Sequence, residues 1–241
     1  MRAAIAAGSA ALIVFARAAL PGRAKTRLIP RLGAWRAARL HAALTACALR
    51  TARDAGFETV ELHVTPRRSR ALFSPYENAF QAKIRYQKGA DLGARMLHAF
   101  EMALRRNRAA ILIGTDCPAL GAADLRRAAR LLASGCDAVL APAEDGGYAL
   151  IALRKVSPRI FEGIAWGGNN VFLKTAERLS RLGLRWRALR TVWDLDRPGD
   201  LERLRGLRPG RVRSLRFSSG PPPRARRSGG SRARWGGSGR T

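Results

Sequence analysis

The sequence predicts an α/β fold with a mainly parallel sheet and helices on both faces of it. Three observations lead to this prediction. Short, continuous apolar runs of the kind that form doubly buried strands occur at residues 10–16, 109–114 and 138–141. Between such runs lie longer segments whose apolar side chains recur at helical spacing. Strands that alternate with helices in this way are typical of βαβ units.

The elements follow in order along the chain. The predicted strands are residues 10–16, 59–64, 83–86, 109–114, 138–141, 148–153 and 185–189. The predicted helices are residues 35–55, a helix capped by Asp91, residues 122–133 and 169–182, and a short helix near Pro198. Residues 17–30 are expected to be a loop, and residues 66–80 a loop with at most a short helix. We expect one domain over residues 1–208.

The charge of the chain has two explanations. The formal net charge is +28, and 40 of the 45 basic residues are arginine. A basic chain of this kind can bind nucleic acid or an acidic membrane, but a compositional bias towards arginine and alanine explains the charge without any ligand. No known nucleic-acid-binding module is present, so we expect anionic small-molecule substrates and no nucleic-acid partner. Residues 209–241, rich in Arg, Gly, Pro and Ser, are predicted to be a disordered tail.

Cysteine usage and hydropathy indicate a cytoplasmic protein. Cys47, Cys117 and Cys136 are far apart and form neither a CxxC motif nor a zinc site. The alanine-rich start resembles a signal peptide, but Arg17 interrupts the apolar run. No stretch of about 18 uninterrupted apolar residues exists, so no membrane span is expected. His41, His63 and His98 have no ligand spacing, and we interpret them as structural.

The loop after the first predicted strand has the composition of a phosphate-binding loop. It contains Pro21, Gly22, Lys25, Thr26 and Arg27. Glycine allows the backbone to approach a ligand closely, and lysine and arginine donate to phosphate oxygens. The spacing is not that of a Walker loop. A solvated basic loop explains the same residues equally well.

Asp116 is the strongest candidate for a metal ligand. It follows the apolar run 111–113, where a carboxylate is costly unless a cation or donors meet it. Mg²⁺ and Mn²⁺ prefer such oxygens, together with substrate phosphates and water. The alternative is a turn or helix-capping aspartate.

Two further acidic motifs also follow predicted strands. Glu144 and Asp145 precede Gly146 and Gly147, where the acids are candidates for sugar binding or for a catalytic base. A hairpin turn explains this motif as well.

Asp194 and Asp196 alternate by two and are predicted to share a face of an extended segment, which would attract a cation. Helix capping by Asp196 or Asp200 is the alternative.

In this order the motifs resemble the bacterial GT-A-type glycosyltransferases formerly classed as a domain of unknown function, some of them linked to arsenosugar biosynthesis. The matching residues are Pro21, Gly22, Lys25, Thr26, Arg27, Leu28, Gly89, Asp91, Leu92, Gly93, Arg95, Met96, Gly114, Asp116, Pro118, Pro142, Glu144, Asp145, Gly146, Gly147, Tyr148, Phe161, Trp166, Asp194, Asp196 and Asp200. They span about residues 11–205. Two departures bear on acceptor binding and on the local geometry of the site: Gly168 stands where the family usually has Ser or Thr, and Arg197 where it usually has Thr.

The resemblance implies a Rossmann-like GT-A fold, that of the nucleotide-diphospho-sugar transferases. It also implies a divalent metal, Mg²⁺ or Mn²⁺, between Asp116 and the donor diphosphate, with Asp196 as a further candidate ligand. Asp91, Arg95 and Trp166 match the family's motifs, and we expect them to bind substrate beside the Lys25 loop, together with Gly146 and Gly147. We expect Asp145 or Glu144 to contact the sugar or to deprotonate the acceptor.

Three functions are compatible with these residues. The first is a metal-dependent glycosyltransferase that uses a nucleotide-diphosphate sugar and an unknown acceptor. The second is a nucleotidyltransferase of the guanylyl or cytidylyl type, which shares the fold. The third is a non-catalytic basic protein that binds nucleic acid or membrane, and it leaves the ordered acidic motifs unexplained.

Overall fold

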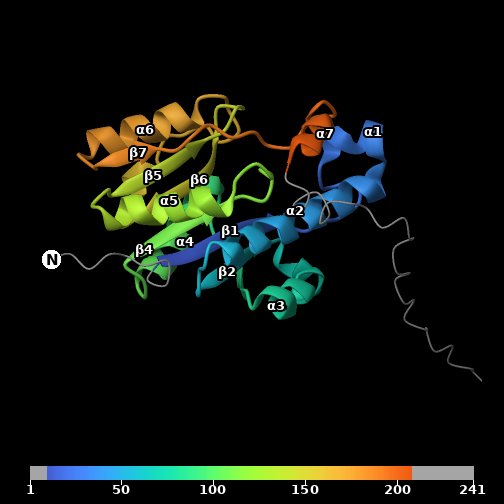
Figure 1. Ribbon diagram of the computed structural model, residues 1–241, viewed down its shortest axis with the longest axis horizontal. Coiled ribbons are helices and arrows are strands. Elements are labelled where there is room, and N and C mark those ends of the chain that lie inside the picture. The colour runs from blue at the N-terminus through green and yellow to red at the C-terminus, as the bar shows by residue number, and fades with distance from the viewer. Residues whose placement is uncertain (1–9, 208–241) are drawn as a thin grey trace, which may run out of the picture.

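The computed structural model describes residues 10–207 of the 241-residue chain. The strands in this part form one seven-stranded sheet in the order β3-β2-β1-β4-β6-β5-β7 (Figure 1). All neighbours pair in parallel except β6, which is antiparallel to both β4 and β5. The mainly parallel sheet is therefore confirmed. The strands are β1 (Ala10–Arg17), β2 (Val60–Thr65), β3 (Lys83–Tyr86), β4 (Ala109–Ile113), β5 (Ala138–Pro142), β6 (Tyr148–Leu153) and β7 (Trp186–Ala188).

Helices cover both faces of the sheet. They are α1 (Ile29–Leu32), α2 (Ala34–Asp54), α3 (Ser74–Phe80), α4 (Leu92–Leu104), α5 (Ala122–Ala133), α6 (Val171–Arg181) and α7 (Asp200–Arg203), with 3-10 turns at Thr26–Leu28, Arg67–Leu72, Pro158–Ile160 and Leu204–Gly206. The helices α2 and α5 pack on one face, and α4 and α6 on the other. Spanning a membrane requires a long apolar helix, and none within residues 10–207 has that length and composition.

A hydrophobic core lies on each face of the sheet, and the continuous apolar strands contribute side chains to both. In β1, Leu12 and Val14 face the α2 and α5 side, whereas Ile13 and Phe15 face the α4 and α6 side. Successive side chains of a strand point to opposite faces, so a strand buried on both sides must be apolar throughout. This explains why the central strands could be recognised from their composition.

Two segments are more regular than the sequence predicts. Residues 66–80, expected to be mostly loop, form a 3-10 segment and the helix α3. The end of the predicted loop 17–30 contains a 3-10 turn and the start of α1. Pro30 and Pro75 each lie in the first turn of a helix, where the missing N–H leaves no bond unmade. The predicted tail, residues 209–241, lies outside the described residues.

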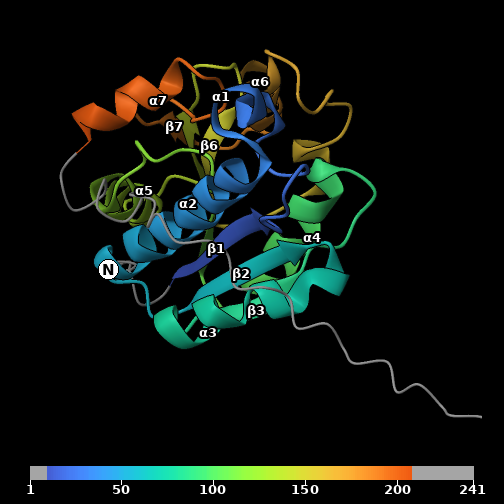
Figure 2. The ribbon, with the colours of Figure 1, turned by 90° about the vertical axis from the view of Figure 1, so that its right-hand side faces the viewer.

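A third, smaller core joins distant parts of the chain near α1 and α7. Leu28, Leu40, Leu44 and Leu195 are buried in it, so the first loop, α2 and the segment before α7 pack together. Leu201 of α7 packs against this cluster from outside. Figure 2 shows α1 and α7 together at that end of the molecule.

We expect Leu28→Ala to lower the free energy of unfolding by about 2–5 kcal/mol, because it leaves a cavity in this third core. Leu173→Ala is the matched control, since the Leu173 side chain is 66% exposed, and should change stability by no more than about 0.5 kcal/mol. Urea denaturation of the two variants measures both effects. Equal losses would show that the Leu28 cluster does not stabilise the fold.

Candidate functional site

Asp116 and Lys25 form an ion pair at the carboxyl edge of the sheet. Asp116 follows β4, and its Oδ1 lies 2.7 Å from Nζ of Lys25. The Lys25 side chain is only 3% exposed, whereas that of Asp116 is 55% exposed. Lys25 has a left-handed backbone conformation, with φ of 50°. A non-glycine residue in this conformation is strained by about 1 kcal/mol or more, and such strain concentrates at functional sites.

Leu195 connects the two partners. Its carbonyl oxygen accepts a hydrogen bond of 2.5 Å from Lys25 Nζ, and its N–H donates to the Asp116 carbonyl at 2.8 Å. Its side chain is fully buried in the third core. The first loop, the end of β4 and the segment 194–196 are therefore held together as one unit.

His41, on α2, is a further neighbour of Asp116. Its Nδ1 lies 3.7 Å from Asp116 Oδ1, beyond hydrogen-bond distance, and its Nε2 lies 3.0 Å from the carbonyl oxygen of Arg17. The half-exposed Asp116 carboxyl loses part of its hydration to the surrounding protein, which alone would raise its pKa. The adjacent His41 imidazole and Lys25 ammonium outweigh that effect and hold this pKa well below its ordinary value. Asp116 is therefore ionised throughout the physiological pH range.

A basic cavity of about 570 Å³ lies beside this ion pair. We define it by its charged lining, which is Arg17, Arg23, Lys25, Arg27, Arg95, Asp116 and Asp196. Thr26 and His41 also line it. Arg27 is ion-paired to Asp196 through one guanidinium nitrogen, which leaves most of its N–H donors for a ligand. The excess of cations makes this cavity suited to an anion.

The turn between β5 and β6 is fixed by backbone contacts. Asp145 Oδ1 accepts a hydrogen bond from the N–H of Gly147 at 2.9 Å, and the Gly146 carbonyl accepts one from Phe172 of α6 at 2.9 Å. Gly146 has φ of 87°, and an added Cβ would lie 1.8 Å from the Asn169 carbonyl oxygen. Only glycine fits at this position. The motif is therefore a hairpin turn, and a hairpin turn does not prevent its acidic side chains from contacting a substrate.

The two acids of this turn point to different places. Glu144 is bound by both terminal nitrogens of Arg203, at 2.7 and 2.8 Å, and this hydrogen bonding lowers the pKa of Glu144. The Arg203 guanidinium also lies 4.7 Å from the ring centre of Trp193. Glu144 therefore anchors α7 and does not line the basic cavity. It does not line the second cavity described below either, whereas Asp145 does.

This second cavity, the acidic cavity, holds about 300 Å³. Its charged lining among the described residues is Asp116, Asp145 and Asp194, and its apolar and aromatic lining includes Phe15, Met96, Tyr148 and Trp166. Asp116 lines both cavities and so stands between them. Burial, followed by the charges of Asp145 and Asp196, raises the pKa of Asp194.

The remaining predicted residues take several positions. Asp91 caps α4 by accepting from the Ala94 N–H at 2.7 Å, which is a structural role. Arg95 Nε donates to the Gly89 carbonyl at 3.1 Å. Trp166 lies so close to Gly93 that a Cβ there would be 2.6 Å from its ring. Pro21 and Gly22 form the turn before Lys25 and line neither cavity.

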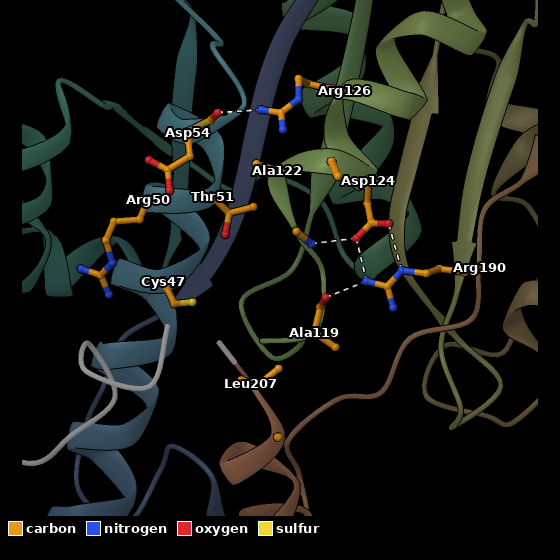
Figure 3. Close-up of a pocket in the computed structure, with 13 residues that line it drawn as sticks. Cys47, Arg50, Thr51, Asp54, Ala119, Ala122, Asp124, Arg126, Arg190 and Leu207 are labelled. Carbon is orange, nitrogen blue, oxygen red and sulfur yellow. Dashed lines mark hydrogen bonds and ion pairs between the residues drawn. The ribbon is translucent and has the colours of Figure 1, made fainter. Parts of the chain in front are cut away.

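A third cavity lies between α2 and α5 (Figure 3). It is larger, about 720 Å³, but none of the predicted site residues lines it. Two of its arginines are bound within the protein: Arg190 donates to both oxygens of the Asp124 carboxylate, and Arg126 donates to the backbone carbonyl of Asp54 (Figure 3). We therefore place the candidate site at the two cavities that share Asp116.

Comparison with known proteins shows the family of the chain. Residues 48–168 match the family described as "Uncharacterized protein conserved in bacteria (DUF2064)". The chain belongs to this family. The finding confirms the family resemblance drawn from the motifs, and the matched range includes Asp116 and Asp145. No curated protein matches the chain in sequence.

Solved structures confirm the fold of this DUF2064 member. A proposed nucleotide-diphospho-sugar transferase of Desulfovibrio desulfuricans G20 is 30% identical, with a TM-score of 0.71 over 79% of this chain and 83% of that one. A nucleotidyl transferase of Methanothermobacter has 15% identity and a TM-score of 0.55 over 86% and 99%. The inositol-1-phosphate CTP transferase of T. maritima has 12% identity and a TM-score of 0.52 over 87% and 96%. The nucleotide-diphospho-sugar transferase fold is therefore shown.

Three residues at the candidate site do not stand out in the sequence. The spacing of His41 predicts a structural or surface role, yet this residue lies beside Asp116. Leu195 and Arg203 hold the site together through a backbone carbonyl and a surface ion pair. The only available signal was weak: Leu195 stands between the two aspartates of a predicted motif.

We expect Lys25→Met to raise the pKa of Asp116 towards its ordinary value of 3.8. A carboxyl whose pKa is lowered on folding stabilises the fold above its unfolded pKa, and this stabilisation is lost as the pH falls towards its folded pKa. Between pH 7 and pH 3 the wild-type protein should therefore lose more stability than Lys25→Met. Denaturation at both pH values measures this. Lys155→Met, at an exposed lysine, is the control and should follow the wild type; a Lys25→Met profile as steep as wild type would contradict the pairing.

Proposed function

We propose that this chain is a glycosyltransferase that moves a sugar from a nucleotide-diphosphate donor to an acceptor lacking a phosphate group. The observation that carries the proposal is the meeting of two cavities of opposite character at Asp116. One is basic and suited to a diphosphate. The other is acidic and apolar, and it suits the sugar and the reacting end of the acceptor.

The donor diphosphate would bind in the basic cavity. Lys25 has three N–H donors, of which two are used by Asp116 and Leu195. The third, together with Arg27 and Arg23, can donate to phosphate oxygens. Because Lys25 is held from two sides, its ammonium is positioned before a ligand arrives, which favours binding.

A divalent cation fits this site together with a substrate. Asp116 and Asp196 line the same cavity, and their ion pairs use Oδ1 of the first and Oδ2 of the second, so each retains a carboxylate oxygen. Within residues 10–207 no three His, Cys, Asp or Glu side chains converge to hold a metal by themselves. Mg²⁺ or Mn²⁺ would therefore take further oxygens from the diphosphate and water. When bound, the metal would stabilise negative charge on the leaving diphosphate.

Asp145 is the residue we propose as the catalytic base. It lines the acidic cavity, and its hydrogen bond to Gly147 occupies one oxygen while the other remains to accept a proton. In the reaction, an acceptor hydroxyl would lose its proton to Asp145 as its oxygen attacks the sugar carbon. The bond from that carbon to the diphosphate would break with its electron pair going to the diphosphate.

The charge of the acidic cavity favours this function over nucleotidyl transfer. A nucleotidyltransferase that acts on a sugar phosphate transfers a nucleotidyl group from a nucleoside triphosphate to that phosphate, and so needs cations for both substrates. No Lys, Arg or His among the described residues lines the acidic cavity. A phosphorylated second substrate would meet three aspartates there without a compensating side chain, which is unfavourable.

The products distinguish the two activities. We expect the purified protein to release a nucleoside diphosphate from one member of a nucleotide-sugar panel in the presence of Mg²⁺ or Mn²⁺, to lose this activity in EDTA and to regain it on adding metal. That donor should also raise the melting temperature. Release of pyrophosphate from a nucleoside triphosphate and a sugar phosphate would instead establish the nucleotidyltransferase.

The adjacent acids of the β5–β6 turn provide a matched pair of variants. Asp145→Asn retains the hydrogen bond to Gly147 but removes the base, and turnover should fall about 100-fold or more. Glu144→Gln weakens only the contact with Arg203 and should retain most of the turnover. Steady-state rates of the two variants with the identified donor measure the difference. A large loss in Glu144→Gln with turnover retained in Asp145→Asn would make Glu144 the catalytic residue.

A further inference from the structure

We propose that the acceptor carries a positive charge on an otherwise apolar group, and that the acidic cavity selects it by charge. This inference rests on the proposed function, because it assigns the acidic cavity to the acceptor. The observations that support it are the charged residues and the apolar residues that line that cavity.

The charges come first. Lys25 already neutralises Asp116, which leaves Asp145 and Asp194 as the acids of the cavity. Within the described residues, neither has an ion-pair partner, and no cationic side chain lines the space. In a chain of net charge +28, a cavity whose charged lining is wholly acidic is the opposite of what chance placement gives. Two carboxylates that repel each other gain from a cation between them.

The walls indicate which kind of cation fits. Phe15, Tyr148 and Trp166 are among the lining residues, together with Met96 and Val171. A strongly hydrated ion gains little from such walls, whereas an alkylated ammonium group gains apolar contact and cation–π attraction. Trp166 is fixed by its packing on Gly93 and Phe161, so its ring is already in place.

Two features act in the opposite direction. Leu92 and Val171, the first residues of α4 and α6, line the cavity, and a helix N-terminus favours anions with an effective charge of about +0.5. The α4 terminus is already capped by Asp91, and the two half charges together are smaller than the two full negative charges of Asp145 and Asp194. The balance in the cavity therefore remains in favour of a cation.

Three small alcohols of similar size test the selection. Choline carries a quaternary ammonium group, 3,3-dimethylbutan-1-ol has the same shape without charge, and 2-hydroxyethanesulfonate has an anionic head. We expect choline to bind at least about tenfold more tightly than the neutral alcohol, and the sulfonate to bind least, in ligand-observed NMR titrations of the full chain without a donor. The high net charge of the protein favours the sulfonate at any nonspecific site, so the test is biased against the proposal.

Variants assign the binding to the cavity. Asp145→Asn and Asp194→Asn should each remove most of the preference for choline over the neutral alcohol, whereas Glu101→Gln, at an exposed residue of α4, should leave it unchanged. Melting temperatures confirm that the variants are folded. Equal binding of the three alcohols, or a choline preference that survives both aspartate variants, overturns the inference. Because no donor is present, these outcomes are separate from those of the turnover assay.

Discussion

The candidate site depends on one buried ammonium group. Lys25 donates to the carboxylate of Asp116 and to the carbonyl of Leu195, and its own backbone is left-handed at that point. Removing a lysine from water is costly unless charged and polar partners replace the lost hydration. Both partners belong to segments distant in sequence, so the charge can be satisfied only when the sheet edge, the first loop and the segment 194–196 are assembled.

Packing and electrostatics support each other at this end of the molecule. Leu28 and Leu195 are buried in the same small core, and this core lies directly beside the polar contacts of Lys25. Arg203 adds a second connection by binding Glu144 and lying over Trp193. The C-terminal part of the described chain is thus a structural component of the site, although it contributes little to the sheet.

The fold and the location of the site could be predicted from sequence because both depend on local composition. Strands buried on both faces are continuous apolar runs, and an aspartate directly after such a run is conspicuous. The composition of β6 does not give its direction, since a parallel and an antiparallel buried strand have similar composition. Only the hairpin interpretation of the motif at residues 144–147 indicates that β6 runs antiparallel to β5. Which of Glu144 and Asp145 faces the cleft, and that His41 reaches Asp116, depend on tertiary contacts to Arg203 and α2. Alternation by two placed Asp194 and Asp196 together, yet they line different cavities.

The reversed direction of β6 has a consequence for the proposed role of Asp145. Because β5 and β6 are antiparallel neighbours, a tight turn rather than a crossover joins them at the carboxyl edge, and α6 holds that turn through the carbonyl of Gly146. The Asp145 carboxylate is therefore preorganised, because its ordering entropy is lost during folding. In the proposed reaction, little reorganisation would then be required as charge develops in the transition state, which is how a rigid polar environment lowers a barrier.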